Sequence, residues 1–317
     1  MSRRFTNPWA HSRHRFRDVF RWKLGMGPRE EKSDAPDQAA ERVAGWTRRE
    51  PPAAGWRVVW LGHASFLLQG CGRSLLVDPV LSEHCAPLPL PPLRRRVAAP
   101  CAAEGLPRID AVLLTHSHYD HLDLPTLRVL GDETPLVVPE GHAGWLRGKG
   151  FREVRELSWF GSDEVLPGIR ITATPACHFT ARTPFDRDLA HWCGWAVEGG
   201  GFRLWHAGDS GYCPAFREIG ERLGPVDLGM IPIGAYAPRW FMEPMHMNPE
   251  EAVQAFVDAA CRKAVAMHWG TFRLTDEPMG EPPLRLAAEL ARRGIPAEDF
   301  VAGKIGEEWR LGGEDVA

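Results

Sequence analysis

The sequence predicts an α/β fold, in which clusters of strands alternate with helices and fit two stacked sheets covered by helices on the outside. Apolar runs of strand length recur along the chain, and glycine or proline bounds most of them. Segments with helical periodicity lie between these runs. With 44% hydrophobic residues, a chain of 317 residues can bury a substantial core. We therefore expect one large domain over residues 51–317, preceded by an arm and linker over residues 1–50.

The predicted strands are the apolar runs at residues 57–61, 65–68, 74–77, 111–114, 136–138, 169–174, 194–197, 203–205, 228–233 and 264–267. Several of them end immediately before polar residues that can carry chemistry. Active sites of α/β proteins gather at such strand ends. The ends of these runs are therefore where we expect the functional site.

The helix predicted over residues 249–262 has the clearest start signal. Asn248 can cap it, Pro249 suits the first helical position, and an acidic pair, Glu250 and Glu251, complements the positive end of the helix dipole. Its buried face is expected to consist of Val253, Phe256, Val257 and Ala260. Further helices are predicted over residues 284–293 and 125–130.

Composition argues against several classes of protein. The formal net charge of −3 does not favour a surface built for nucleic acid, so no nucleic-acid partner is expected. The seven cysteines lack CxxC spacing, which is typical of a reducing compartment. No apolar run of about 18 residues could span a bilayer, and the N-terminus lacks the apolar core of a secretory signal. We expect a cytoplasmic protein, soluble or peripherally associated with a membrane.

The segment 115–123, THSHYDHLD, carries the strongest chemical signal. It crowds His116, His118, Asp120 and His121 directly behind an apolar run. Imidazole and carboxylate are ligands that zinc and its neighbours prefer, and a tight loop can aim alternate side chains at two different metals. His116 and His118 are therefore predicted to bind one metal, and Asp120 and His121 another. A histidine-rich surface turn is the alternative that a lone HxH would favour.

Three more candidate ligands follow apolar stretches elsewhere in the chain. His178 follows ITATPAC, Asp209 follows FRLWHAG, and His268 follows KAVAM. Each is predicted to lie at a strand end, which reinforces the metal-site interpretation.

This pattern resembles the metallo-β-lactamase superfamily of binuclear metallohydrolases, and within it the N-acylphosphatidylethanolamine-hydrolysing phospholipases D and their bacterial relatives. The resemblance spans about residues 56–273 and rests on LGHASFLL, VDPVLS, THSHYDHLD, PACHFTARTPFDRD, WCGW, AGDSGYCPAF, AYAPRWFMEPMHMNPEEAV and MHWGTF. The histidine cluster indicates the superfamily, whereas HFTARTPFDRD and the segment from AYAPRW to PEEAV indicate the phospholipase branch. The resemblance implies an αββα sandwich of the metallo-β-lactamase type.

The resemblance also implies two divalent metal ions held by seven side chains. The first metal would be held by His116, His118 and His178, the second by Asp120, His121 and His268, and Asp209 would bridge them. Zinc is the expected metal, and iron or manganese would also suit this donor set.

The expected nucleophile is a metal-bridging hydroxide, because two cations lower the pKa of a shared water. Asp120 is also predicted to be catalytic, since its second oxygen could orient that hydroxide. Cys213 lies four residues beyond Asp209 and is expected to be packed rather than ligating.

The supporting residues have two interpretations each. Asp78 could fix a ligand imidazole from behind, or simply start a turn before a proline. His63 resembles a histidine that the family places near the metals, or is a core histidine. His246 is predicted to be catalytic, either contacting the phosphate or assisting the leaving group. The alternative is that it belongs to the cap region of the next helix. Arg182 and Arg239 could pair with phosphate oxygens, or be solvated.

The N-terminal arm is basic and amphipathic. Its basic residues are Arg3, Arg4, Arg13, Arg15, Arg17, Arg21 and Lys23, and apolar residues at helical spacing are Phe16, Val19, Phe20 and Leu24. The arm could lie on an anionic membrane surface or pack its aromatic face on the domain, and residues 30–50 are expected to be a linker. The proline-rich loop 87–96, which ends in Arg94, Arg95 and Arg96, is a second candidate for lipid contact, or packs on its own domain.

Together these features predict a phosphodiesterase that hydrolyses N-acyl phosphatidylethanolamine or a related phospholipid to phosphatidate and N-acylethanolamine. The alternatives are another hydrolase of the same fold, such as a lactonase of the ascorbate 6-phosphate type or a nuclease, and a non-catalytic binding module. The branch-like segments count against the other hydrolases, and the full set of seven ligand candidates counts against the binding module.

Overall fold

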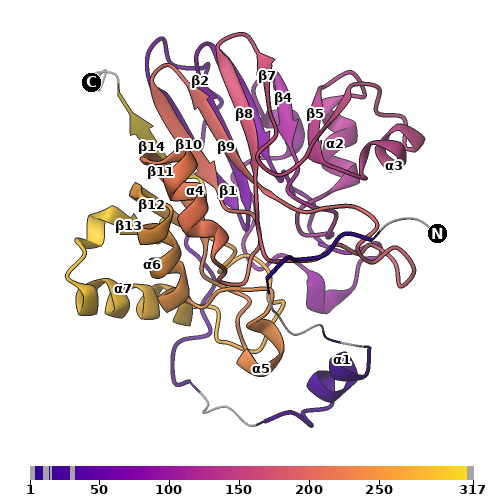
Figure 1. Ribbon diagram of the computed structural model, residues 1–317, viewed down its shortest axis with the longest axis vertical. Helices are drawn as coiled ribbons and strands as arrows, with labels where there is room; N and C mark the ends of the chain where they lie inside the picture. The colour runs from indigo at the N-terminus through magenta and orange to yellow at the C-terminus, as the bar shows by residue number, and fades with distance from the viewer. Residues whose placement is uncertain (1–3, 10–13, 15, 29–32, 313–317) are drawn as a thin grey trace.

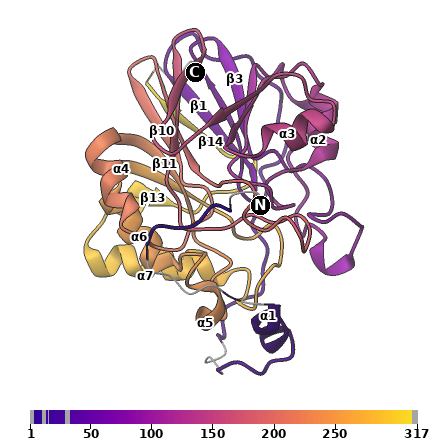
Figure 2. The same cartoon turned by 45° about the vertical axis from the view of Figure 1, so that its right-hand side comes forward.

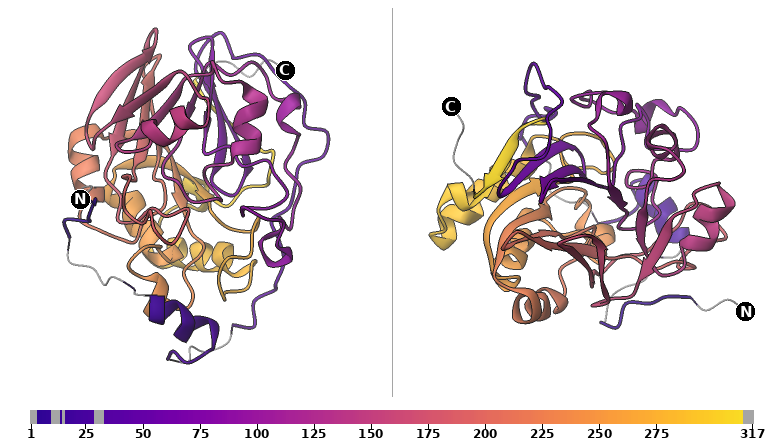
Figure 3. Two further views of the ribbon diagram at one scale, coloured as in Figure 1. Left: turned by 90° about the vertical axis from the view of Figure 1, so that its right-hand side faces the viewer. Right: turned by 90° about the horizontal axis from the view of Figure 1, so that it is seen from above.

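The computed structural model describes residues 4–9, 14, 16–28 and 33–312. Two seven-stranded sheets lie face to face, with helices on their outer sides (Figure 1). The predicted αββα sandwich is confirmed. The view from above in Figure 3 shows the two sheets as adjacent layers.

The first sheet has the strand order β14 (Glu308–Leu311), β1 (Trp56–Gly62), β2 (Ser65–Gly70), β3 (Arg73–Val77), β4 (Ala111–Leu113), β5 (Leu136–Pro139) and β6 (Val154–Leu157). The second has the order β13 (Phe300–Val301), β12 (Cys261–Met267), β11 (Val226–Pro232), β10 (Phe202–His206), β9 (Gly194–Gly199), β8 (Ile169–Thr174) and β7 (Ser162–Leu166). Both sheets are mixed. In the first, β3 to β6 are parallel, and in the second, β10 to β13 are parallel.

The central strands are buried on both faces. In β2, Phe66 and Leu68 point between the sheets, while Leu67 points outward under α2 (Leu124–Leu130) and α3 (Ala143–Gly148). The outer face of the second sheet is covered by α4 (Ala215–Leu223), α6 (Pro249–Asp258) and α7 (Glu281–Arg293). Burial on both faces explains why these strands are continuous apolar runs in the sequence.

Each apolar run predicted to be a strand is a strand in the structure. The strands that the sequence did not indicate are β6, β7, β13 and β14, and these are the edge strands of the two sheets. An edge strand pairs with a neighbour on one side only and is more exposed to solvent, so it carries polar residues such as Arg155 and Glu156 in β6. Their sequences therefore lack the apolar signal of a buried strand.

The helix predicted over residues 249–262 is α6, and it is shorter than predicted. Asn248 caps it in a reciprocal capping box with Glu251, as the sequence indicated. The helix ends at Asp258 because the backbone from Cys261 onward hydrogen-bonds to β11 as strand β12. Val257 and Ala260 are exposed, so the prediction of the buried face is correct for Val253 and Phe256 only.

The helices predicted near residues 125–130 and 284–293 correspond to α2 and α7. The sequence did not indicate α3, α4 or the short α5 (Arg239–Met242). Short 3₁₀ turns also occur at η1 (Pro91–Leu93), η2 (Ala103–Gly105) and η3 (Ala297–Asp299).

The N-terminal arm packs on the domain in its described part. Helix α1 (Phe16–Lys23) lies beside α5 (Figure 2), and the Trp22 ring stacks on Phe241 at 5.1 Å. The arm's Val19, Phe20 and Leu24 remain exposed. Of the basic residues noted in the sequence, Arg3, Arg13 and Arg15 lie outside the described residues. Among the described helices, none has the length and apolar character needed to cross a bilayer.

Candidate metal centre

Strand ends from both sheets meet at one edge of the sandwich. Strands β1, β3 and β4 run in one direction in the first sheet, and β8, β10 and β12 run in one direction in the second. The segments that follow these strands carry His63, Asp78, the loop 116–121, His178, Asp209 and His268. The structure therefore brings the predicted ligands together from distant parts of the sequence.

The predicted ligands form two overlapping groups. The donor atoms of His116, His118 and His178 lie within 4.8 Å of one another, with Nδ1 of His118 at 2.9 Å from Nε2 of His116 and 3.2 Å from Nε2 of His178. The second group is Asp120, His121 and His268, joined by His63.

Asp209 lies between the two groups. Its Oδ2 is 3.1 Å from Nε2 of both His121 and His268, and 3.8 and 4.0 Å from Nε2 of His178 and His116. One carboxylate thus contacts imidazoles of both groups, as a bridging position requires.

The charges of this cluster favour bound cations. Burial lowers the pKa of His118 to about 4 and of His178 to about 3, so these imidazoles are neutral and can act as ligands. Burial alone would raise the pKa of Asp209, but His121 and His268 hold it well below its usual range. His118 and His178 are therefore neutral beside ionised carboxylates. Despite burial, Asp209 and Asp120 raise the pKa of His121, and that of His268 to about 9, so a cation held by these two imidazoles would displace their protons.

The residues present fit a pair of metal ions. His178 Nδ1 lies 3.0 Å from the Met245 carbonyl, so the proton is on Nδ1 and Nε2 presents a lone pair to the cluster. Asp209 Oδ1 is buried and has no hydrogen-bond partner among the described residues, and the buried Nε2 atoms of His121 and His268 have Asp209 Oδ2 as a neighbour at 3.1 Å without hydrogen-bond geometry. Buried polar atoms without partners are costly, and metal coordination would satisfy them.

Asp78 holds the loop from behind. Its Oδ1 accepts from the Thr115 backbone N–H at 2.7 Å, and its Oδ2 lies 2.6 Å from both Thr115 Oγ1 and His121 Nδ1. The predicted contact with a ligand imidazole is therefore present. Asp78 also has a φ of 43°, so it starts a sharp turn as well. The two interpretations of Asp78 are compatible.

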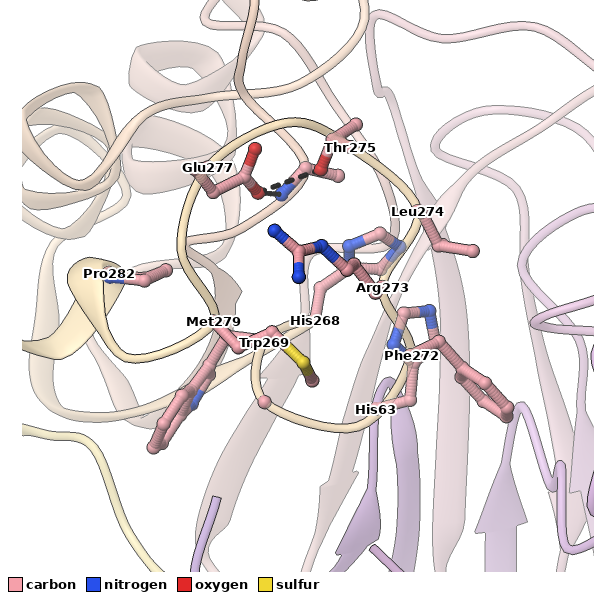
Figure 4. A pocket seen from close by; sticks show the side chains of 12 residues that line it. His63, His268, Trp269, Phe272, Arg273, Leu274, Thr275, Glu277, Met279 and Pro282 are labelled. Carbon is pink, nitrogen blue, oxygen red and sulfur yellow. Dashed lines mark hydrogen bonds between the residues drawn. The ribbon is translucent and has the colours of Figure 1, made fainter. Parts of the chain in front are cut away.

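His63 belongs to the cluster rather than to the core alone. Its Nε2 is 2.9 Å from Asp120 Oδ2, and its ring lies 4.0 Å from that of His268. Figure 4 shows both imidazoles in a small pocket beside Phe272 and Arg273. The Thr271 hydroxyl, which the sequence did not single out, accepts from the His63 backbone N–H at 2.7 Å.

His246 lies beside the first group. It forms a group with His178 and Asp209 whose donor atoms are within 4.8 Å, and its Nδ1 is buried and has no hydrogen-bond partner in the described chain. Asn248, not His246, is the helix cap. His246 therefore lies next to the predicted metal ligands and does not cap the helix.

The two arginines considered for phosphate binding have hydrogen-bond partners within the protein. Arg182 Nη1 donates to the carbonyls of Ser117 at 2.8 Å and Leu122 at 2.9 Å, and so ties down both ends of the histidine loop. Arg239 pairs with Glu251 and donates to the His246 carbonyl at 3.0 Å. Neither guanidinium group is simply solvated, and contact with a phosphate stays a prediction.

Two further expectations concern single residues outside the cluster. Cys213 packs in the hydrophobic core as expected, and burial raises the pKa of its thiol to about 12. The loop 87–96 was considered for lipid contact or for packing on its own domain, and of its three arginines Arg94 and Arg96 are exposed whereas Arg95 is partly buried. Its side chain turns inward and donates to the carbonyls of Val80, Ser82 and Val97.

Comparison with known proteins agrees with this architecture. The family described as beta-lactamase superfamily domain matches residues 73–269. The chain belongs to the metallo-β-lactamase superfamily. The match includes all seven predicted ligands.

Two relatives are similar to the chain over most of its residues. An uncharacterized protein of Mycobacterium tuberculosis is 40% identical over 238 residues, covering 73% of this chain and 63% of the relative. The chain thus spans less than two thirds of that relative's length. The N-acyl-phosphatidylethanolamine-hydrolyzing phospholipase D 1 of Caenorhabditis elegans is 36% identical over 270 residues, covering 81% of this chain and 76% of the relative.

A solved structure shows a similar fold. It is a possible metal-dependent hydrolase from Veillonella parvula, with a TM-score of 0.66 at 19% identity, covering 81% of this chain and 100% of that chain.

Proposed function

We propose that this chain is a binuclear metal-dependent phosphodiesterase that hydrolyses N-acyl phosphatidylethanolamine, or a related phospholipid, to phosphatidate and an N-acylethanolamine. The observation that carries the proposal is the convergence of six histidine and aspartate side chains on Asp209; five of the seven residues are buried, and His118 and Asp120 are partly exposed. The substrate class is supported by the similarity to the nematode phospholipase. The catalytic unit is proposed to be residues 51–317.

The proposed ligands follow the two groups. His116, His118 and His178 would hold one cation, Asp120, His121 and His268 the other, and Asp209 both. Zinc is the proposed metal, since imidazole and carboxylate suit it. When bound, two such cations supply an activated water and positive charge that stabilises a phosphodiester as it is cleaved.

The chain's own residues orient this centre. Asp78 holds His121, and the Met245 carbonyl holds His178, so each imidazole presents Nε2 to the interior. Asp120 Oδ2 accepts a hydrogen bond from His63 Nε2–H, and the other carboxylate oxygen is proposed to orient a water. His246, beside the first group, is proposed to contact the phosphoryl oxygens or the leaving group.

A lipid substrate requires a surface that can approach a bilayer. We propose that the loop 87–96 and the outer face of α1 form this surface. Leu88 is 64% exposed and Leu90 and Phe20 are also exposed, near the exposed cations Arg94 and Lys23. Exposed apolar side chains beside basic ones suit the interface of an anionic membrane.

The function is tested by incubating metal-loaded protein with N-acyl phosphatidylethanolamine, a chromogenic phosphodiester and a lactone. We expect release of N-acylethanolamine by the parent and loss of this release in Asp209→Asn. Asp163→Asn, which alters an exposed aspartate paired with Arg155, is the matched control and should retain activity. Turnover of the lactone alone would replace the phosphodiesterase proposal with a lactonase.

The lipid surface is tested by sedimentation with vesicles of phosphatidylcholine and phosphatidylserine. Leu88→Ser combined with Leu90→Ser should reduce the bound fraction. Val129→Ser, an exposed apolar residue on α2, serves as control. Equal binding of both variants and the parent would rule out a role for the loop.

A further inference from the structure

We infer that Asn7, in the N-terminal arm, is a positioning residue for His178 in the metal centre. The inference rests on the proposed metal site and adds to it a part of the chain that lies outside the matched superfamily residues 73–269. Asn7 Nδ2 donates to the His178 carbonyl at 2.9 Å, across 171 positions of sequence.

Asn7 is itself fixed from its other side. Its Oδ1 accepts from Trp192 Nε1 at 3.1 Å, and the same indole donates to the Ala176 carbonyl at 2.8 Å. One side-chain amide therefore bridges two segments, with its donor on His178 and its acceptor on Trp192. The Trp192 indole keeps a partner even when Asn7 is replaced.

The residues around Asn7 hold the arm against the domain. The Phe5 backbone N–H donates to the Asp188 carbonyl at 2.9 Å, and the Phe5 ring meets His191 edge-on at 4.5 Å. On the other side, Trp9 stacks on Trp159 at 5.6 Å. Residues 4–9 thus form a strap that is anchored by an aromatic ring on each side of Asn7.

The strap completes the support of His178. The residue before it, Cys177, is tied to the Asp209 segment, because its N–H donates to Ser210 Oγ at 2.8 Å. The imidazole is oriented by the Met245 carbonyl. The backbone carbonyl of His178 accepts the hydrogen bond from Asn7. His178 is only 2% exposed, so loss of this bond would leave a buried carbonyl unsatisfied and free the residue to shift.

Small shifts of a ligand weaken metal binding. Removing an outer hydrogen-bond partner of a metal ligand typically costs about 10- to 100-fold in metal affinity. We therefore expect the arm to raise the affinity of the metal that His178 holds, while the metal held by Asp120, His121 and His268 is less affected.

The test measures cobalt binding to the chain of residues 1–317 by absorption spectroscopy, with competition by a chelator. Asn7→Leu keeps a similar volume without the amide, and Asn7→Ala removes the side chain. We expect one of two cobalt ions to bind about 10- to 100-fold more weakly in both variants. Thr6→Ala, an exposed neighbour in the same strap, is the control and should bind cobalt like the parent.

The outcomes separate the two proposals. Two cobalt ions in the parent with unchanged affinity in a folded Asn7→Leu variant, checked by circular dichroism, would overturn the role of Asn7 alone. Absence of cobalt binding in the folded parent would instead overturn the metal centre, and with it this inference. Equal weakening in Thr6→Ala would show a general effect of the strap rather than the Asn7 amide.

Discussion

Asp78 Oδ2 and His121 Nδ1 lie 2.6 Å apart, and neither side chain is exposed to solvent. The two residues come from the ends of neighbouring parallel strands, β3 and β4. Because Nδ1 of His121 is held by Asp78, Nε2 faces Asp209. This pair of side chains therefore positions a ligand at the centre of the cluster relative to the first sheet.

Replacing Asp78 should therefore weaken metal binding. In Asp78→Asn, the amide nitrogen would face a donor at His121 or Thr115, so we expect metal affinity to fall by about 10- to 100-fold. Zinc affinity is measured by chelator competition. Asp110→Asn is the matched control, since Asp110 accepts from the Ser74 N–H at the opposite end of β3. A parent-like affinity in Asp78→Asn would contradict the prediction.

Arg182 should matter for turnover although it is not expected to touch the substrate. Arg182→Ala removes the donors to the Ser117 and Leu122 carbonyls and the stacking on Tyr119 at 3.9 Å. A loop misplaced by about 1 Å can lose on the order of 10²-fold in rate, so we expect kcat/KM on N-acyl phosphatidylethanolamine to fall by about that factor. Arg152→Ala, an exposed arginine, is the control. Equal rates in the two variants would show that the loop holds its shape without Arg182.

The capping box of α6 should contribute measurably to stability. Asn248→Ala removes the acceptor for the Glu251 N–H, and we expect the free energy of unfolding to fall by about 1 kcal/mol. Urea denaturation measures the loss. Asn248→Asp keeps the acceptor and should unfold close to the parent, and an equal loss in both variants would argue against the cap.

His142 should make stability depend on pH. Burial lowers its pKa in the folded state to about 4, whereas an unfolded histidine titrates near 6.5. The unfolded chain therefore takes up a proton first as the pH falls, so this contribution to stability is full above pH 6.5 and declines toward pH 4, by at most about 1.4 kcal/mol per pH unit.

His142→Gln removes that titration and should give a flatter dependence than the parent. Urea unfolding at pH 7.5, 5.5 and 4.5 measures it. The difference between the two proteins isolates His142 from the other buried histidines. Parallel curves would contradict the assignment.

Burial determines which strands could be predicted from the sequence. Strands that are covered on both faces, such as β2 and β11, are continuous apolar runs and could be read from the sequence. The edge strands β6 and β14 could not, because their solvent-exposed sides carry polar residues and their pairing is set by distant parts of the chain.

The distance between site residues along the sequence determines how readily they could be predicted. His116 to His121 stand together in one motif, so local sequence was enough to group them, while His178, Asp209 and His268 needed the strand-end argument and the resemblance. Arg182 was singled out, but its hydrogen bonds to the Ser117 and Leu122 carbonyls could not be predicted, because backbone carbonyls as acceptors leave no mark in the sequence. Asn7 could not be found for the same reason.

Three residues of the cluster lie in a backbone region that most amino acids avoid. His63, Asp78 and His268 have φ values of 52°, 43° and 62°. Such a conformation costs a non-glycine residue about 1–2 kcal/mol, and glycine would relieve it while removing the side chain from the cluster. Substitutions that raise thermal stability at these three positions therefore lower activity. A library screened for heat resistance alone should enrich glycine there at the expense of activity.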